Sequence, residues 1–334
     1  MSTPPIRRYV LHVGGTQAQV LRSGPPDVLT VGRGKALNNG LALASLLFPI
    51  CPRAHQIAAL RAAENATGLV LPDGQAAARE MLLLSEGIFS AVWRAALSWA
   101  KVLHTHPPAA AVQQARQANE ALAEALFQTD WACLGGAKMA LNADDINSAL
   151  KMLTRAFEAV DRLGEDICLK AQTIQVRRIA TSTLDARAET RRNTSNPVEE
   201  TPRLLLAPMQ QATSLEPWLS AQLQHGANML EELKQQASNV HEEKPASATA
   251  RANGSGFGIA MTARGRLRHA LTLEDGIITR WSAKAPTDWN FRPNGAACRV
   301  ASALEETSEE NASMLLAALD PCAPCEVVLE AAHA

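Results

Sequence analysis

The sequence has few aromatic residues and no excess of charge of either sign. Its 334 residues include 32 Lys and Arg against 33 Asp and Glu, which gives a formal net charge of −1. Binding to nucleic acid or to an anionic membrane through overall charge requires a basic excess, so we expect neither partner. Aromatic residues make up 4% of the chain and hydrophobic residues 47%. The interior must therefore be mainly aliphatic, which favours closely packed helices over an aromatic-rich β-sandwich.

Long apolar runs are also missing. No uninterrupted stretch reaches the roughly 18 residues that a membrane-spanning helix needs. The first eight residues, MSTPPIRR, lack the apolar core of a secretory signal. We therefore expect a cytoplasmic protein without a membrane partner. In that reducing compartment the six cysteines are expected to be free thiols or metal ligands rather than disulfides.

Helical spacing of apolar residues dominates positions 36–180. A helix is predicted at 143–163, capped by Asn142 and followed by Gly164 as its stop signal. Residues 76–102 are apolar over much of the helix circumference, which predicts a central helix buried among others. This region supplies the helical core of the expected fold.

Period-two patterns at the two ends of the chain predict two β-hairpins. Gly14-Gly15 is the turn of the first, and Glu274-Asp275-Gly276 is the turn of the second. The predicted strands are 9–13, 19–21, 259–261, 267–273 and 277–281. We expect an α+β fold, a mainly helical bundle core with a short N-terminal β-hairpin and a C-terminal β-hairpin.

We expect one domain over residues 1–334. Within it, residues 185–256 have a different composition, polar and rich in turn residues, and are interpreted as a variable, partly flexible linker or insertion with one helix at 215–238. The Gly-rich stretch 254–258 is interpreted as a hinge. A last helix is predicted from Thr307, with capping-box spacing to Glu310, up to Asp320-Pro321.

Two thiols lie three residues apart in the C-terminal run Asp320-Pro321-Cys322-Ala323-Pro324-Cys325. Because they directly follow a helix stop, Cys322 and Cys325 can converge on one soft metal ion. They can equally form a redox-active dithiol. This pattern alone leaves a metal site, a redox pair and an inert pair open.

A third thiol, Cys51, lies at a predicted helix start. Pro52 suits the first helical position, which places Cys51 at the N-cap, beside the positive end of the helix dipole. That location favours the thiolate. His55 follows four residues later and therefore lies on the same helix face. The alternative is a buried cysteine near a histidine that is bonded to a carbonyl group.

Taken in order, five segments resemble the large subunit of nickel–iron hydrogenases. They are Arg33-Gly34, Phe48 to His55, Arg264-Gly265, Pro286 to Asn290, and Asp320 to Cys325. In that family four cysteines hold the metals, the first of each pair on nickel and the second bridging nickel and iron. The first N-terminal position is Phe48 here, which cannot be a ligand. The resemblance thus implies a site for iron and no nickel.

A large-subunit-like chain without this nickel ligand resembles the HupK/HoxV family of hydrogenase maturation proteins. The family's processing histidine is also absent, because Val328 stands at its position. The resemblance implies a non-catalytic scaffold or carrier for the iron dicyanide carbonyl fragment, Fe(CN)2CO, during assembly of the active site. The implied partners are HypC-like and HypD-like maturation proteins and the apo hydrogenase large subunit.

The resemblance also implies roles for individual residues. Cys51 and Cys325 would bind the iron, and Cys322 would assist capture or handover. His55 would donate a hydrogen bond to a thiolate. Arg264 would point its guanidinium group at a cyanide nitrogen, and Thr287 matches a hydroxyl position in the family's cyanide-binding segment.

Two other functions are compatible with the sequence. A degenerate but active hydrogenase would contain nickel and take up hydrogen. A structural-zinc or redox protein built on Cys322 and Cys325 would contain zinc or form a disulfide, and would contain no iron. Metal analysis together with infrared spectroscopy distinguishes all three.

Overall fold

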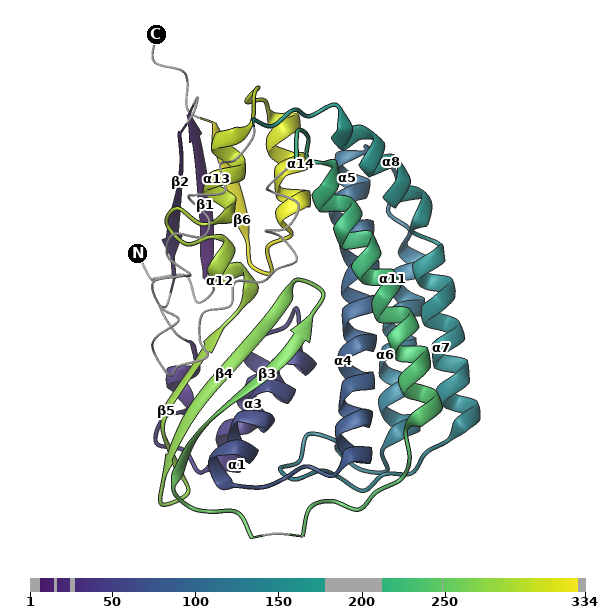
Figure 1. The fold of residues 1–334 in the computed structure, drawn as a ribbon, viewed down its shortest axis with the longest axis vertical. Coiled ribbons are helices and arrows are strands. Elements are labelled where there is room, and N and C mark those ends of the chain that lie inside the picture. The colour runs from purple at the N-terminus through teal and green to yellow at the C-terminus, as the bar shows by residue number, and fades with distance from the viewer. Residues whose placement is uncertain (1–6, 15–16, 25–27, 178–211, 248, 330–334) are drawn as a thin grey trace.

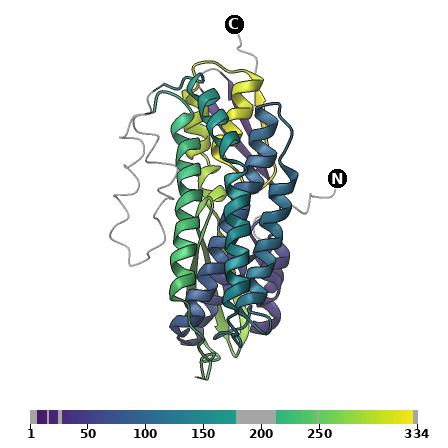
Figure 2. The same ribbon diagram turned by 90° about the vertical axis from the view of Figure 1, so that its right-hand side faces the viewer.

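Long helices form one side of the molecule, and two small β-sheets with short helices form the other (Figure 1). The computed structural model describes residues 7–14, 17–24, 28–177, 212–247 and 249–329. The long-helix side contains α4 (Asp73–Arg94), α6 (Ala109–Leu126), α7 (Ala143–Glu158), α8 (Asp161–Gln172) and α11 (Glu216–Asn239). Figure 2 shows these helices standing side by side as a bundle. The expected α+β fold with a mainly helical core is confirmed.

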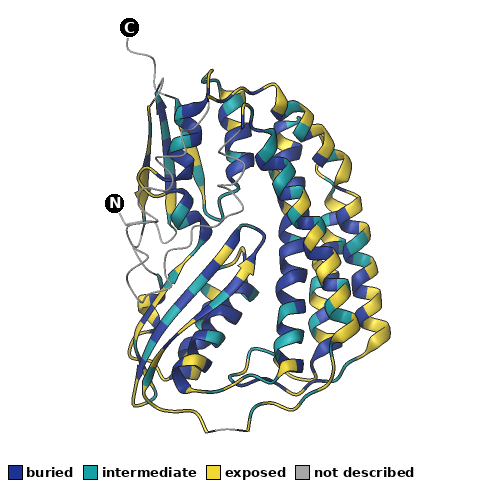
Figure 3. Cartoon of the chain, viewed as in Figure 1, coloured by how far each residue is buried: buried dark blue, intermediate teal, exposed yellow. Residues whose placement is uncertain are grey.

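Helix α4 is the central buried helix that the sequence predicts. It continues without a break into the π-helix η2 (Ala95–Trp99) and α5 (Ala100–Val102). By length and composition the helical segment Asp73–Val102 is apolar enough to cross a membrane. The sequence did not predict this candidate, because it contains no long uninterrupted apolar run. In this fold 78% of its apolar window is covered by the rest of the chain, and α4 is mostly dark blue in Figure 3. The segment therefore acts as a core helix here.

The single helix predicted at 143–163 is two helices. Asn142 caps α7 as predicted, since its side chain accepts from the backbone N–H groups of Asp144 and Asp145. The helix ends at Glu158, and α8 then runs straight through Gly164. A Cβ on Gly164 would lie 2.6 Å from Leu223 of α11. This glycine allows two helices to approach closely and does not terminate either of them.

The N-terminal sheet joins the two ends of the chain. Its strand order is β2 (Gln17–Ser23), β1 (Arg8–Gly14), β6 (Cys325–Leu329). The antiparallel pair β1 and β2 is the predicted N-terminal hairpin. Strand β6 was not predicted; it pairs parallel to β1, with Tyr9 opposite Cys325. This pairing fixes the C-terminal cysteine motif against the start of the chain.

The second sheet packs on helix α3 (Pro52–Thr67). Its strands β3 (Gly254–Thr262), β4 (Gly265–Glu274) and β5 (Ile277–Lys284) are antiparallel neighbours in that order. The interpretation of 254–258 as a hinge is wrong, because these residues form the start of β3. A Cβ on Gly258 would lie 2.1 Å from the carbonyl oxygen of Ala58. The glycines are needed because β3 lies directly on the α3 backbone.

Short elements complete the sheet side. They are η1 (Val28–Gly32), α1 (Leu37–Leu41), α2 (Leu43–Leu47), α12 (Pro286–Asn290), α13 (Ala296–Ala303) and α14 (Glu309–Leu319). The cap of α14 is Ser308 rather than Thr307, since the Ser308 hydroxyl accepts from the backbone N–H of Asn311. The helix ends at Asp320, as predicted, in the left-handed conformation with φ 42°.

The stretch 185–256 contains the predicted helix, α11. The described residues between α11 and β3 form no helix or strand, yet hydrogen bonds hold them: the Gly74 N–H donates to the Glu243 carboxylate, and the Ala246 N–H donates to the Gly135 carbonyl. Residues 185–211 lie outside the described part of the chain. Flexibility of that segment therefore stays a prediction.

Candidate metal centre

Four segments that are far apart in sequence meet around two thiols. Cys51 lies at the N-terminus of α3, Arg264 in the β3–β4 turn, Thr287 in α12, and Asp320 and Cys322 in the loop between α14 and β6. Cys51 and Cys322 interact electrostatically with each other and with Arg264. Cys51 is 8% exposed. Segments near the two ends of the chain thus bring two thiols together, Cys51 and one cysteine of the C-terminal pair.

Asp320 holds the arginines of this site. Its Oδ2 lies 2.8 Å from Arg94 Nη1 and 3.0 Å from Arg264 Nε, and its Oδ1 accepts from Arg264 Nη2 at 3.2 Å. Burial alone would raise the pKa of Asp320, but the two guanidinium groups outweigh it and hold the pKa below its ordinary value. The carboxylate is therefore ionised and fixes the position of Arg264.

Arg264 retains one donor for a ligand. Its Nη1 is buried and has no hydrogen-bond partner among the described residues. Burial would lower the pKa of Arg264, but the charge of Asp320 outweighs it and holds the pKa above its ordinary value, so the group is always charged. An unsatisfied buried donor on a charged group is costly to keep. Its presence beside Cys51 and Cys322 indicates a place for an acceptor that carries negative charge.

Thr287 makes two hydrogen bonds with Cys322. The hydroxyl donates to Cys322 Sγ at 3.0 Å and accepts from the Cys322 backbone N–H at 3.0 Å. Burial raises the pKa of the Cys322 thiol, while Arg264 and Thr287 act in the opposite direction. Burial also raises the pKa of Cys51 well above its ordinary value. Both groups are therefore neutral thiols when nothing is bound to them.

Cys325 is not part of this pair. It begins strand β6, its sulfur lies 3.9 Å from the Glu326 carbonyl oxygen, and burial followed by the Glu326 charge raises its pKa to about 12. The resemblance implied that Cys51 and Cys325 act together, whereas the structure brings Cys51 together with Cys322. Among the described residues, no three or more His, Cys, Asp or Glu side chains converge to hold a metal ion.

His55 makes a different contact from the expected one. Its Nδ1 lies 2.9 Å from His269 Nε2, and its ring stacks on Phe48 with centroids 3.5 Å apart. His269 Nδ1 accepts from Trp281 Nε1 at 3.1 Å. Tryptophan only donates, so His269 donates through Nε2 and His55 accepts through Nδ1. The hydrogen bond that His55 makes is thus to His269 and not to a thiolate.

Two further residues belong to this site and were not predicted from the sequence. Glu86 of α4 accepts from the backbone N–H groups of Arg53 and Ala54 at 2.8 and 2.9 Å and so caps α3 beside Cys51. Burial raises the pKa of Glu86 to about 7. The other missed residue is Arg94, the partner of Asp320. Both are buried charged residues of α4, and a charged residue in a helix predicted to be buried is a signal that could have identified them.

Comparisons with known proteins place the chain among hydrogenase-related sequences. Residues 202–328 match the family model for nickel-dependent hydrogenase. The hydrogenase expression/formation protein HupV of Azotobacter chroococcum mcd 1 is 28% identical over 323 residues, covering 88% of each chain. The protein HupK of Azotobacter vinelandii, which carries the same description, is 28% identical over 90% of this chain and 91% of that protein.

Solved structures show the same fold. The reduced, active nickel–iron–selenium hydrogenase from Desulfomicrobium baculatum superposes with a TM-score of 0.65 at 13% identity, covering 93% of this chain and 97% of that one. The reduced enzyme from D. vulgaris Hildenborough gives a TM-score of 0.61 at 13% identity, over 93% and 96% of the two chains. At this level of identity the likeness shows the fold alone.

The chain thus has the fold of nickel–iron–selenium hydrogenases, and its residues 202–328 match the nickel-dependent hydrogenase family model, as the resemblance in the sequence implied. It is a relative of the HupK and HupV proteins and a degenerate relative of the hydrogenase large subunit.

Proposed function

We propose that this chain carries iron as the Fe(CN)2CO fragment during assembly of a nickel–iron hydrogenase active site in the cytoplasm, and that it does not catalyse hydrogen chemistry itself. The description of HupK and HupV as hydrogenase expression/formation proteins supports a role in maturation. The observation that carries the proposal is the buried, unpartnered Nη1 of Arg264 beside Cys51 and Cys322.

The thiols of Cys51 and Cys322 suit an Fe(CN)2CO fragment better than they suit a bare metal ion. Fe(CN)2CO brings three diatomic ligands of its own, so the protein needs to add few donors. Cys51 and Cys322 supply two soft sulfur ligands once they lose their protons. Cys325 follows three residues later in the loop–strand junction and is the third thiol available for capture or handover. Bare zinc would need a closed set of four ligands, which the described residues do not assemble.

Arg264 and Thr287 would hold the fragment in place. Arg264 Nη1 would donate a charge-assisted hydrogen bond to a cyanide nitrogen, while Asp320 keeps the guanidinium group aimed. Thr287 would stabilise the Cys322 thiolate through its hydroxyl. His55 lies one helical turn from Cys51 and has Nε2–H as its remaining donor, after its Nδ1 accepts from His269.

Infrared spectroscopy on protein purified without air tests the proposal. We expect cyanide and carbonyl bands from the wild-type protein when it is produced together with the hydrogenase maturation machinery. Cys51→Ala and Cys322→Ala should each lose the bands, because each removes a ligand. Cys133→Ala is the matched control, since that thiol is exposed and lies on another loop. Retention of the bands in both ligand variants would exclude this assignment.

The same sample tests the competing functions. Nickel together with hydrogen uptake would indicate a hydrogenase, and one zinc per chain would indicate a zinc protein. We expect neither, because the resemblance in the sequence assigns Phe48 to the position of the first nickel ligand, and a phenylalanine cannot be a ligand. The proposed partners are HypC-like and HypD-like proteins that deliver the fragment and an apo hydrogenase large subunit that receives it.

A further inference from the structure

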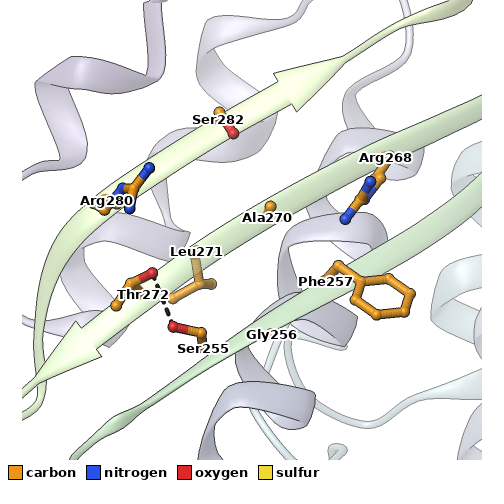
Figure 4. Close-up of a pocket in the computed structure, with 9 residues that line it drawn as sticks. All are labelled: Ser255, Gly256, Phe257, Arg268, Ala270, Leu271, Thr272, Arg280 and Ser282. Carbon is orange, nitrogen blue, oxygen red and sulfur yellow. Dashed lines mark hydrogen bonds between the residues drawn. The ribbon is translucent and has the colours of Figure 1, made fainter. Parts of the chain in front are cut away.

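The outer face of the sheet β3–β4–β5 carries two arginines, Arg268 and Arg280, that have no ion-pair partner among the described residues. Residues of β4 alternate: Leu267, His269 and Leu271 are buried, while Arg268, Ala270 and Thr272 point outward. The strand register places Ser282 beside Ala270 and Arg280 beside Thr272 on β5. Figure 4 shows these side chains together on one side of the sheet, with the helices behind it.

A pocket of about 420 Å³ opens on this face. Its floor is made by Ala270 and the backbone of Gly256, which leaves room between Arg268 and Arg280 (Figure 4). The Arg268 guanidinium lies 5.0 Å from the centroid of the Phe257 ring, which fixes its position. Its Nε is buried and has no hydrogen-bond partner in the described chain. Arg268 and the exposed Arg280 both line the pocket, so both guanidinium groups can face a ligand bound there.

The basic character of this face is local and does not reflect the net charge of the whole chain. The chain is nearly neutral, whereas the outer face has Arg268 and Arg280 with no carboxylate partner in the described residues. Glu274 is the acidic residue at the far end of β4, where it accepts from Thr279 at 3.5 Å. Beside the basic residues, Phe257 on β3 is 40% exposed. An acidic and partly apolar ligand is complementary to such a surface.

The spacing of the arginines indicates the size of the ligand. Arg280 lies opposite Thr272, four residues along β4 from Arg268, so the two positions are about 13 Å apart at 3.3 Å per strand residue. A single phosphate or a small dicarboxylate spans much less. Two carboxylates four residues apart in an extended polypeptide have this spacing, with room for an apolar side chain against Phe257.

We infer that the outer face of β3–β4–β5 binds an extended acidic segment of a partner protein, with one carboxylate on Arg268 and one on Arg280. The inference goes beyond the carriage of iron and concerns a surface separate from the two thiols. Bidentate hydrogen bonds from the two guanidinium groups would set the register, and contact with Phe257 would add apolar burial.

Fluorescence anisotropy tests this with a labelled synthetic peptide, Ser-Glu-Thr-Leu-Thr-Glu-Ser, and with the same peptide carrying Gln for both Glu. We expect wild-type protein to bind the Glu peptide at least about tenfold more tightly than the Gln peptide. The double variant Arg268→Gln/Arg280→Gln should lose this preference. The control Lys151→Gln/Arg162→Gln removes the same charge from exposed positions of α7 and α8 and should keep it.

Inorganic phosphate and vesicles of phosphatidylglycerol are the competing probes. Binding of either that depends on Arg268 and Arg280, without preference for the Glu peptide, would overturn the inference. Equal binding of both peptides by wild-type protein would overturn it too. If the double variant does not fold, as judged by its thermal melt, Arg280→Gln alone serves, because Arg280 is exposed. Infrared bands of bound iron should be unchanged in these variants, which separates this test from that of the proposed function.

Discussion

The hydroxyl of Thr287 donates a hydrogen bond to the sulfur of Cys322 at 3.0 Å and accepts one from the backbone N–H of the same residue at 3.0 Å. One side chain thus fixes both the thiol and the backbone of the C-terminal loop. Together with the parallel pairing of β6 on β1, this contact holds the C-terminal motif against segments from the rest of the chain.

Thr287→Val should weaken both the fold and the site. The Cys322 N–H would lose its acceptor, which costs about 1–3 kcal/mol when the group is not rehydrated. The Cys322 thiolate would also lose a donor, so the infrared bands of bound iron should be weaker. Urea unfolding and infrared intensity measure the two effects. Thr287→Ser keeps the hydroxyl and should behave as wild type; equal losses in both variants would contradict the role of the hydroxyl.

Asp320→Asn should destabilise the protein strongly. The substitution leaves the buried Arg94 and Arg264 without their counter-charge, a change that typically costs about 3–5 kcal/mol. The midpoint of urea unfolding measures it. Glu120→Gln is the control, because it removes one carboxylate from an exposed pair with Arg116, and such pairs contribute little. An Asp320→Asn midpoint as high as that of the control would show that the paired charges do not stabilise the fold.

Stability should fall as the pH falls below about 6.5. Burial lowers the pKa of His269 from 6.5 to about 3, and burial also lowers that of His55. Below pH 6.5 the unfolded chain therefore takes up protons that the folded chain does not. Each histidine then removes about 1.4 kcal/mol of unfolding free energy per pH unit, down to its folded pKa.

Urea unfolding at about pH 7 and pH 5 checks this slope. His269→Gln, which keeps an acceptor for Trp281, should lose less stability between the two conditions, by about 2 kcal/mol. Burial of Glu86 acts in the opposite direction, because its pKa is raised to about 7. Because Glu86 is present in both proteins, its contribution cancels when the variant is compared with the wild type. An unchanged slope in His269→Gln would mean that His269 is protonated in the folded protein.

Gly258→Ala should destabilise the contact between β3 and α3. The added methyl group would lie 2.1 Å from the Ala58 carbonyl oxygen, and neither backbone can move away without disturbing the sheet or the helix. We expect a loss of about 1–3 kcal/mol or more. Thermal unfolding measures it. Ser282→Ala on the exposed face of β5 is the control, and an equal melting temperature for the two variants would contradict the close packing.

Local patterns predicted most of the fold. The hairpins, the Asn142 cap and the buried helix at 76–102 follow from period, turn residues and apolar content, which are properties of short segments. Strand β6 could not be predicted in this way, because the five residues that begin at the last cysteine of the Cys-x-x-Cys motif become a strand only by pairing with β1. Gly254 to Gly258 looked like a hinge because the helix that requires small residues lies about 200 residues earlier.

Local sequence motifs likewise predicted only part of the candidate site. The motifs identified Cys51, Cys322, Arg264 and Thr287, and the structure places all four together. The choice of Cys322 over Cys325 as the neighbour of Cys51 depends on where β6 begins, and sequence spacing does not contain that information. The hydrogen bond between His55 and His269 joins a helix and a strand that lie more than 200 residues apart in the sequence. Only their packing reveals it.

The proposal that Cys51 and Cys322 hold an iron fragment is tested most directly by iron analysis and infrared spectroscopy on one sample purified without air. We predict one iron per chain with cyanide and carbonyl bands in the wild-type protein and in Cys133→Ala, and loss of iron and bands together in Cys51→Ala and Cys322→Ala. Bands that persist in both ligand variants, or nickel or zinc in place of iron in the wild-type protein, would contradict the account.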